Sequence, residues 1–215
     1  MLTMIIGATG FVTAAAPPFK ITGLDNKTLQ DHWDKRAETY LSLATDNFPN
    51  MFIMLGPNAA IGSGSLTLMI ESVGDYVIKC VRKLQKENIK SMTVKSARVR
   101  DFIRYTDAYF KGTVFTDECN SWYRKGDKIT GLWPGSTLHC MDVMRSPRWE
   151  DFDYEYLPEE DGGELNQLGF LGNGWSINQL EQRDLGFYVL PQFQSVPSAP
   201  LPEKNDLYRM RLFSY

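Results

Sequence analysis

The chain has 215 residues, 43% hydrophobic and 23% charged, which is ordinary for a soluble globular protein. A net charge of −3 leaves no basic surface for nucleic acid and argues against such a partner. No apolar run is long enough to cross a membrane and the three cysteines lack metal-binding spacing, so we expect a reduced, cytoplasmic protein without a metal site.

The first predicted element is a short apolar strand at residues 2–6, which ends at Gly7-Ala8-Thr9-Gly10. Small residues leave room for a ligand, and Thr9 offers a hydroxyl group or a backbone N–H. A plain strand end followed by turn glycines is the alternative interpretation. The N-terminal apolar run has no basic residue before it, so we do not expect a secretory signal peptide.

A short helical segment is predicted at 28–33, after an extended connector that contains Pro17-Pro18. It carries His32, which lies between Asp31 and Asp34 in the sequence. We interpret His32 as a solvated surface histidine rather than a catalytic base.

Residues 48–66, FPNMFIMLGPNAAIGSGSL, are the most informative stretch. The apolar run Met51–Leu55 stops at Gly56-Pro57, which predicts a buried strand followed by a tight turn. A strand, a glycine-rich turn and a helix form the layout by which α/β proteins hold phosphates or ring cofactors. Glycines let a ligand approach the backbone, and the first N–H groups of the helix face it. We therefore predict a ligand site at residues 56–66.

A long amphipathic helix is predicted from Leu66 to near Asn88, because apolar residues recur at steps of three and four while charged residues fall on the other face. Ser63 or Ser65 can cap its start, and basic residues suit its end. A brief strand at 92–94 and a second helix at 97–111 follow, and a β segment is predicted from Thr113.

Trp122 and Tyr123 stand in a cluster of polar and basic residues at 119–135. An indole ring donates one hydrogen bond and offers a broad face for stacking, so Trp122 is a candidate ligand contact. The alternative is an aromatic plug in the core. Residues 148–160 are rich in acids, which is typical of a solvated face, and His139-Cys140 is interpreted as structural.

Several motifs resemble, in order, the C-terminal half of flavin-dependent Baeyer-Villiger monooxygenases, particularly fungal ones of natural-product pathways. They are ATGF at 8–11, FPNMF at 48–52, GPN at 56–58, GSGSL at 62–66, NSWY at 120–123, YEY at 154–156 and GNG at 172–174. The resemblance covers nearly all of this chain but only the later part of the family's chain.

The resemblance implies an α/β fold that is part of a flavoprotein with two dinucleotide-binding domains, with one long amphipathic helix and an aromatic-rich C-terminal extension. It implies FAD and NADPH as cofactors and oxygenation of a ketone with O2, and it places Trp122 at the nicotinamide. The implied cofactor-binding residues are Thr9, Gly10, Gly56, Pro57, Asn58, Gly62, Ser63, Gly64, Ser65 and Trp122. No catalytic residue is assigned.

The chain contains neither of the family's GxGxxG turns, which bind the two dinucleotides. We therefore expect a single domain at 1–190 with a proline-rich tail at 191–215, which acts with an N-terminal flavoprotein subunit or self-associates. Alternatives are a remnant without activity and a cofactor-independent cyclase or isomerase acting on a small natural-product intermediate. The candidate liners of a cyclase cavity are Tyr105, Tyr109, Trp122, Tyr123, Trp133 and His139.

Overall fold

The structure is a computed structural model that describes residues 16–117, 121–158, 167–186 and 189. The chain divides into two units, Met1–Phe170 and Leu171–Tyr215. The predicted strand at 2–6, Thr9 and Gly10, and the tail at 191–215 lie outside the described residues. The predicted division into a domain at 1–190 and a tail therefore stays a prediction.

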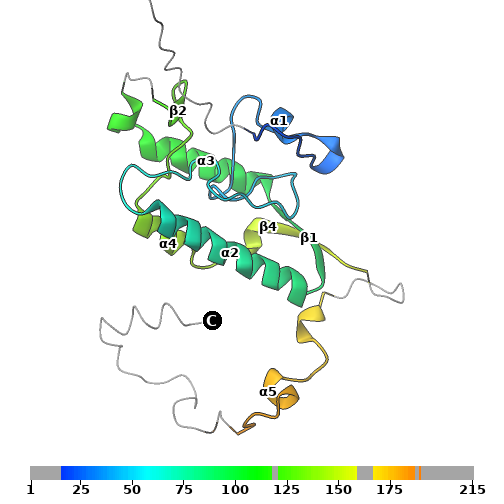
Figure 1. The fold of residues 1–215 in the computed structure, drawn as a ribbon. Coiled ribbons are helices and arrows are strands. Elements are labelled where there is room, and N and C mark those ends of the chain that lie inside the picture. The colour runs from blue at the N-terminus through cyan, green and yellow to red at the C-terminus, as the bar shows by residue number, and fades with distance from the viewer. Residues whose placement is uncertain (1–15, 118–120, 159–166, 187–188, 190–215) are drawn as a thin grey trace, which may run out of the picture. The chain divides into compact units, whose positions relative to one another are not determined.

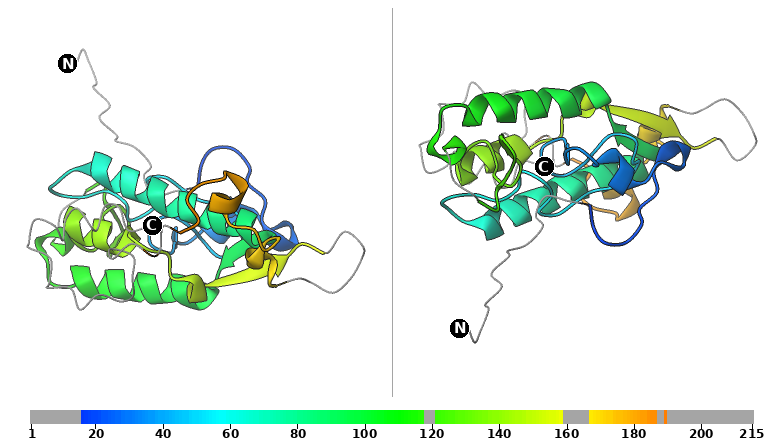
Figure 2. Two further views of the ribbon diagram at one scale, coloured as in Figure 1. Left: turned by 90° about the horizontal axis from the view of Figure 1, so that it is seen from below. Right: turned by 90° about the horizontal axis from the view of Figure 1, so that it is seen from above.

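Two long helices and a two-stranded ribbon form the frame of the first unit (Figure 1). Strand β1, Ile89–Val94, connects helix α2, Leu66–Lys86, directly to helix α3, Ser96–Phe110. Strand β4, Phe152–Tyr156, pairs with β1 in antiparallel orientation. Both helices leave the ribbon toward the same side, so the start of α2 and the end of α3 lie away from it (Figures 1 and 2).

The other described elements of this unit are short, and the longest of them is α4. They are the 3-10 helices η1 (Leu24–Asn26), η2 (Val114–Thr116) and η3 (Trp149–Asp151), the helices α1 (Leu29–His32) and α4 (Thr137–Met144), and the antiparallel strands β2 (Arg124–Lys125) and β3 (Lys128–Ile129). The 3-10 helix η4 (Gly169–Leu171) leads to the second unit, whose described residues include helix α5 (Ile177–Leu180).

Helix α2 occupies the place predicted for the long helix. Ser65 is its N-cap and accepts a hydrogen bond from the Leu68 amide at 3.3 Å. Its buried residues, Met69, Val73, Tyr76 and Cys80, recur at the helical spacing. A Cβ atom at Gly74 would meet no other atom within 4 Å, so this glycine does not serve close packing.

The predicted strand at Met51–Leu55 is wrong. The segment is irregular: the Ile53 amide donates to the Leu43 carbonyl at 2.7 Å, and Leu55 has a positive φ of 56°. Met54 and Leu55 are exposed rather than buried. No strand among the described residues pairs with this run, so its apolar composition does not lead to pairing in a sheet.

The β segment predicted from Thr113 is also wrong, because this region forms the 3-10 helix η2. The Thr113 and Thr116 hydroxyls each donate to the carbonyl three residues earlier, at 2.7 Å. Such local bonds compete with a strand ladder. Phe115 packs edge-on against Phe110 and Tyr123, which fixes the turn over the end of α3.

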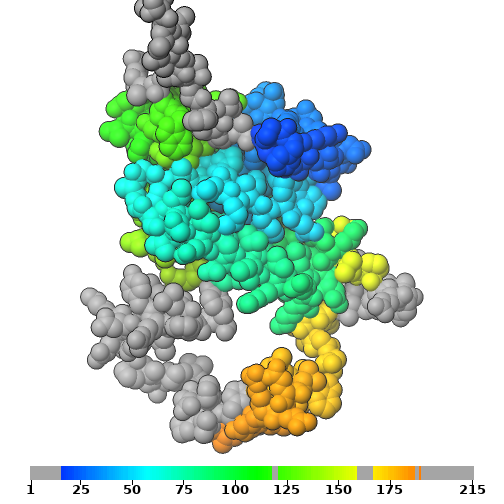
Figure 3. All heavy atoms as spheres, in the orientation of Figure 1, coloured from blue at the N-terminus to red at the C-terminus, as the bar shows by residue number. Residues whose placement is uncertain are grey.

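The main core lies between α2, α3, α4 and the β1–β4 ribbon, and it also contains Tyr40, Leu43 and Ala44 from the loop before α2. A second cluster joins α1 to Phe48, and a third joins the end of α3 to Ile129 and Leu132. In Figure 3 the cyan segment before α2 is exposed on the face between the blue N-terminal segment and that helix.

One member of the acidic run at 148–160 is not solvated. Asp151 is buried, accepts a hydrogen bond from the Tyr40 hydroxyl at 2.6 Å, and is paired with Arg148 at 3.1 Å. Burial raises the pKa of Tyr40, so this tyrosine stays a neutral donor. The contact connects the loop before α2 to the start of β4.

Candidate functional site

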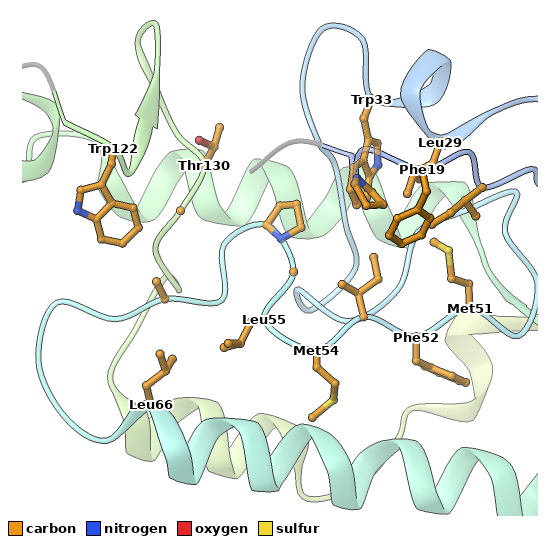
Figure 4. A pocket seen from close by; sticks show the side chains of 17 residues that line it. Phe19, Leu29, Trp33, Met51, Phe52, Met54, Leu55, Leu66, Trp122 and Thr130 are labelled. Atoms are coloured by element: carbon orange, nitrogen blue, oxygen red, sulfur yellow. The ribbon is translucent and has the colours of Figure 1, made fainter. Parts of the chain in front are cut away.

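A pocket of about 550 Å³ lies where the sequence predicts part of a ligand site (Figure 4). Residues 51–57 form one wall, Leu66 lies at the start of α2, and Trp122, Thr130 and Gly131 form the opposite wall. The remaining lining comes from residues 17–33 and from Ala60. No charged side chain belongs to the lining in the part of the chain that the structure describes.

The Gly56-Pro57 turn is fixed by close packing. A Cβ atom at Gly56 would collide with the backbone oxygen of Ser42, so only glycine fits. The Thr39 hydroxyl donates to the Pro57 carbonyl at 3.3 Å. Both predicted ligand contacts, Gly56 and Pro57, therefore line the pocket from a rigid turn.

Asn58 connects this turn to the opposite wall. Its fully buried side chain donates from Nδ2 to the carbonyls of Ile129, at 2.9 Å, and Leu132, at 3.1 Å. Its backbone amide donates to the Thr130 carbonyl at 2.8 Å, and its φ is 64°. Asn58 is not among the lining residues of the pocket, and these bonds give it a structural position.

The opposite wall carries Trp122. The amides of Thr130 and Gly131 both donate to the Tyr123 carbonyl at 2.9 Å. A Cβ atom at Gly131 would lie 2.9 Å from Tyr123 Cα and 3.3 Å from the Trp122 ring, so glycine is needed for this approach. Trp122 is therefore part of a surface wall and not a core plug, and its ring faces the pocket opposite Leu55 (Figure 4).

The predicted residues Gly62, Ser63, Gly64 and Ser65 lie beside the pocket and not in its lining. The first three are exposed, so the backbone before α2 is accessible. Gly64 has a φ of 116°, and a Cβ atom there would collide with Thr137 Oγ1 at the start of α4. Thr9 and Gly10 lie outside the described residues.

His32 differs from the prediction of a solvated side chain between Asp31 and Asp34. Its Nε2 lies 2.9 Å from Asp46 Oδ1, and its ring packs on Phe48 at 5.5 Å between centroids. This contact holds α1 against the loop before α2. His139 accepts a hydrogen bond at Nδ1 from the indole of Trp133 at 3.1 Å, in agreement with a structural role.

The contribution of α1 to the pocket was not predicted from the sequence. Leu29 and Trp33 stand four residues apart and both line it, together with Phe19 from the connector. Their spacing indicates one apolar helix face, but it does not identify the segment that packs against that face. Among the described residues no group of three or more histidines, cysteines or acids could hold a metal ion, and no helix could span a membrane.

Comparison with known proteins gives fungal FAD-binding monooxygenases among the relatives of this chain. The chain is 36% identical over 192 residues to the FAD-binding monooxygenase tazF of Aspergillus terreus, which covers 86% of this chain and 33% of that protein. It is 34% identical over 175 residues to the FAD-binding monooxygenase moxY of Dothistroma septosporum, covering 80% and 27%. The match lies in the C-terminal portion of these relatives, so the chain spans at most about a third of their length. No family model matches.

Solved structures share the fold over about two-thirds of this chain. A closed crystal structure of cyclohexanone monooxygenase has a TM-score of 0.57 and 21% identity, and covers 64% of this chain and 27% of that chain. An oxidized steroid monooxygenase bound to NADP has a TM-score of 0.55 and 22% identity, with the same coverage. The shared fold is a mixed α/β arrangement that makes up about a quarter of those chains.

Proposed function

Because this chain is homologous to the C-terminal portion of fungal FAD-binding monooxygenases over most of its length, we propose that it is the corresponding part of such an enzyme. The reaction is a Baeyer-Villiger oxygenation of a ketone that uses FAD, NADPH and O2. Both this chain and the portion that corresponds to the remainder of the relatives supply binding residues for FAD and NADPH. This holds whether the two portions form one polypeptide or two.

The observation that supports this proposal is the meeting of two distant motifs at one pocket. Gly56 and Pro57 of the GPN motif face Trp122 of the SWY motif, and Asn58 hydrogen-bonds the loop that carries the tryptophan wall. If each motif served only to pack the core, the two motifs would not need to line the same cavity. The arrangement suits a ligand held between a rigid turn and an indole face.

The described residues fit the ring systems of these cofactors and not their phosphates. The exposed backbone at Gly62 to Gly64 precedes the N-terminal end of α2, where the helix dipole favours negative charge on a nearby ring. No charged side chain lines the adjacent pocket to hold a phosphate, in the part of the chain described. Phosphate binding is therefore assigned to the remaining portion of the enzyme.

When bound, the flavin and the nicotinamide supply the redox chemistry of the oxygenation. The residues of this chain would bind and orient these two cofactors. The Trp122 indole would contact the nicotinamide carboxamide as a hydrogen-bond donor, the turn at Gly56-Pro57 would limit the position of the ring, and the apolar lining would exclude water from the substrate. We place Thr9 and Gly10 near both cofactors by resemblance, and no residue of the chain is assigned as an acid or base.

A cofactor-independent cyclase or isomerase is not favoured. Of the six aromatic residues considered for a cyclase cavity, only Trp122 lines the pocket. Tyr105 and Tyr109 lie on α3, and Tyr105 stacks on His139 at 6.4 Å, away from this lining. The fungal relatives named above are FAD-binding monooxygenases.

The test uses a fusion of this chain to the portion of the Aspergillus terreus relative that precedes its match. We expect the purified fusion to retain FAD, seen by visible absorbance, and to be reduced by NADPH. Trp122→Ala should weaken NADP binding about tenfold, because one hydrogen bond to a ligand is worth about 1.4 kcal/mol. Trp175→Ala, which removes an exposed tryptophan of the second unit, is the matched control. A fusion without FAD would contradict the proposed function.

A further inference from the structure

Asp107 of helix α3 forms ion pairs with two other segments of the first unit. Its two carboxylate oxygens accept hydrogen bonds from the two terminal nitrogens of Arg36, at 2.8 and 3.0 Å, and Lys128 Nζ lies 3.3 Å from Oδ2. The bidentate pair is only 13% exposed at Arg36 and 29% exposed at Asp107, so water screens it less than a surface pair. Burial alone would raise the pKa of Asp107, but the two cations hold it below its usual value. The carboxylate is therefore ionised and attracts both partners.

Arg36 lies in a loop that also carries part of one pocket wall. The Trp33 indole donates to the Glu38 carbonyl at 3.1 Å, which closes this loop around Arg36. Trp33 lines the pocket, and Thr39, the residue after the loop, donates to the Pro57 carbonyl at 3.3 Å. The Arg36 guanidinium group thus anchors a segment that contacts the pocket at two places.

Lys128 belongs to strand β3 of the hairpin that holds the opposite wall. Shortly after it, the Thr130 and Gly131 amides donate to the Tyr123 carbonyl at 2.9 Å. These bonds fix the backbone next to Trp122, whose ring faces the pocket (Figure 4). The Lys128 ammonium group is thus a charged contact between α3 and the segment that carries this ring.

We infer that Asp107 is a positioning residue that holds the two pocket walls at a fixed separation and thereby places the Trp122 indole for its contact with the nicotinamide. The ligand in this inference rests on the proposed function, whereas the ion pairs are a property of this chain. Asp107 does not line the pocket, so it acts through the walls and does not touch the ligand. Such contacts matter because a small displacement of a binding group lowers the affinity for its ligand.

Asp101 offers a matched comparison on the same helix. It pairs with Arg98 at 2.9 Å and with Arg104. Both partners lie on α3, so these pairs stabilise the helix and reach neither wall. Asp101→Asn and Asp107→Asn each remove one carboxylate that pairs with two cations. Of the two, Asp107 has its partners outside α3.

Amide hydrogen exchange in the isolated chain tests the positioning without any ligand. Asp107→Asn should speed the exchange of the Thr130 and Gly131 amides about fivefold, because the hairpin loses its charged contact with α3. Asp101→Asn should leave these two amides unchanged. Lys128→Gln removes the hairpin pair and keeps the Arg36 pair. Since Lys128 is 43% exposed, this variant should fold and show the same effect even if Asp107→Asn does not fold.

NADP binding to the fusion described above tests the link to the ligand. We expect Asp107→Asn to weaken NADP binding about fivefold while the fusion retains FAD, because the indole is no longer held in place. Asp107→Glu keeps the charge and should restore most of the affinity. A purely structural role of Asp107 would not predict this rescue together with unchanged retention of FAD. Asp101→Asn should bind NADP as the unsubstituted fusion does.

The outcomes separate this inference from the proposed function. Unchanged exchange at Thr130 and Gly131 in both Asp107→Asn and Lys128→Gln, or equal changes in Asp101→Asn, overturns the inference whether or not the fusion binds FAD. Faster exchange with unchanged NADP affinity in a fusion that retains FAD also overturns it and leaves the function standing. A fusion without FAD contradicts the proposed function and the role at the nicotinamide, and the exchange rates then still decide whether Asp107 holds the walls.

Discussion

Asn58→Ala is the sharpest test of how the two walls of the pocket are held together. The substitution removes two buried hydrogen bonds, from Nδ2 to the Ile129 and Leu132 carbonyls, each worth about 1 kcal/mol. It also places alanine at a φ of 64°, which costs about 1 kcal/mol more. Oδ1 has no partner among the described residues, so its loss costs nothing. We expect the free energy of unfolding to fall by about 3 kcal/mol, a loss of about 6–12 °C in melting temperature.

Urea unfolding followed by tryptophan fluorescence measures this change, and two further substitutions separate its parts. Asn58→Gly loses the same bonds without the backbone strain, so it should cost about 1 kcal/mol less than Asn58→Ala. If Asn58→Ala unfolds at the wild-type urea concentration, the side-chain amide of Asn58 does not hold the two walls together.

Asn58→Asp adds a dependence on pH. The new carboxylate would face two carbonyl oxygens in a buried site, which raises its pKa in the folded state above the unfolded value of about 3.9. A raised folded-state pKa gives stability that is present at low pH and is lost as pH rises. N58D should therefore lose stability from about pH 4 upward, whereas N58A should show no such additional loss.

Three further predictions concern stability. Gly64→Ala should destabilise the chain by at least about 2 kcal/mol, because φ is 116° and the new Cβ collides with Thr137 Oγ1; wild-type stability in urea would contradict this packing. Gly74→Ala, in open space on α2, should stabilise by about 1 kcal/mol, and a loss measured by thermal melting would mean an unrecognised contact. Burial raises the pKa of Cys80 from 9.0 to about 12 and that of Cys140 to about 11, so the thiols of the unfolded chain ionise first. Unfolding free energy should thus decline as pH rises above 9, and less steeply in Cys140→Ala.

Local periodicity explains which elements the sequence could predict. Helices α2 and α3 and strand β1 lie within a few residues of their predicted bounds, because the sequence of each segment contains the periodic spacing of its buried residues. The cap at Ser65 is equally local. The bond from Tyr40 to Asp151 joins residues 111 apart and has no local pattern, so an acidic residue in an apparently solvated run could not be recognised as buried.

The sequence could predict part of the pocket lining, whereas a ligand-binding role for any of these residues stays a prediction. Gly56, Pro57 and Trp122 line one pocket, as a shared ligand site requires, but Asn58 of the same motif turns inward and bonds the opposite wall. A side chain amide suits either a ligand or a backbone carbonyl, and the sequence does not distinguish the two. The backbone pairing between residues 58–60 and residues 129–133 decides which of these two partners the Asn58 amide meets.

The error at Met51–Leu55 has a different cause from the error at Thr113. At Thr113, local hydroxyl bonds override a weak strand propensity, and the sequence of the segment contains the reason. At Met51–Leu55 no local feature opposes a strand, and the described residues simply contain no strand to pair with it.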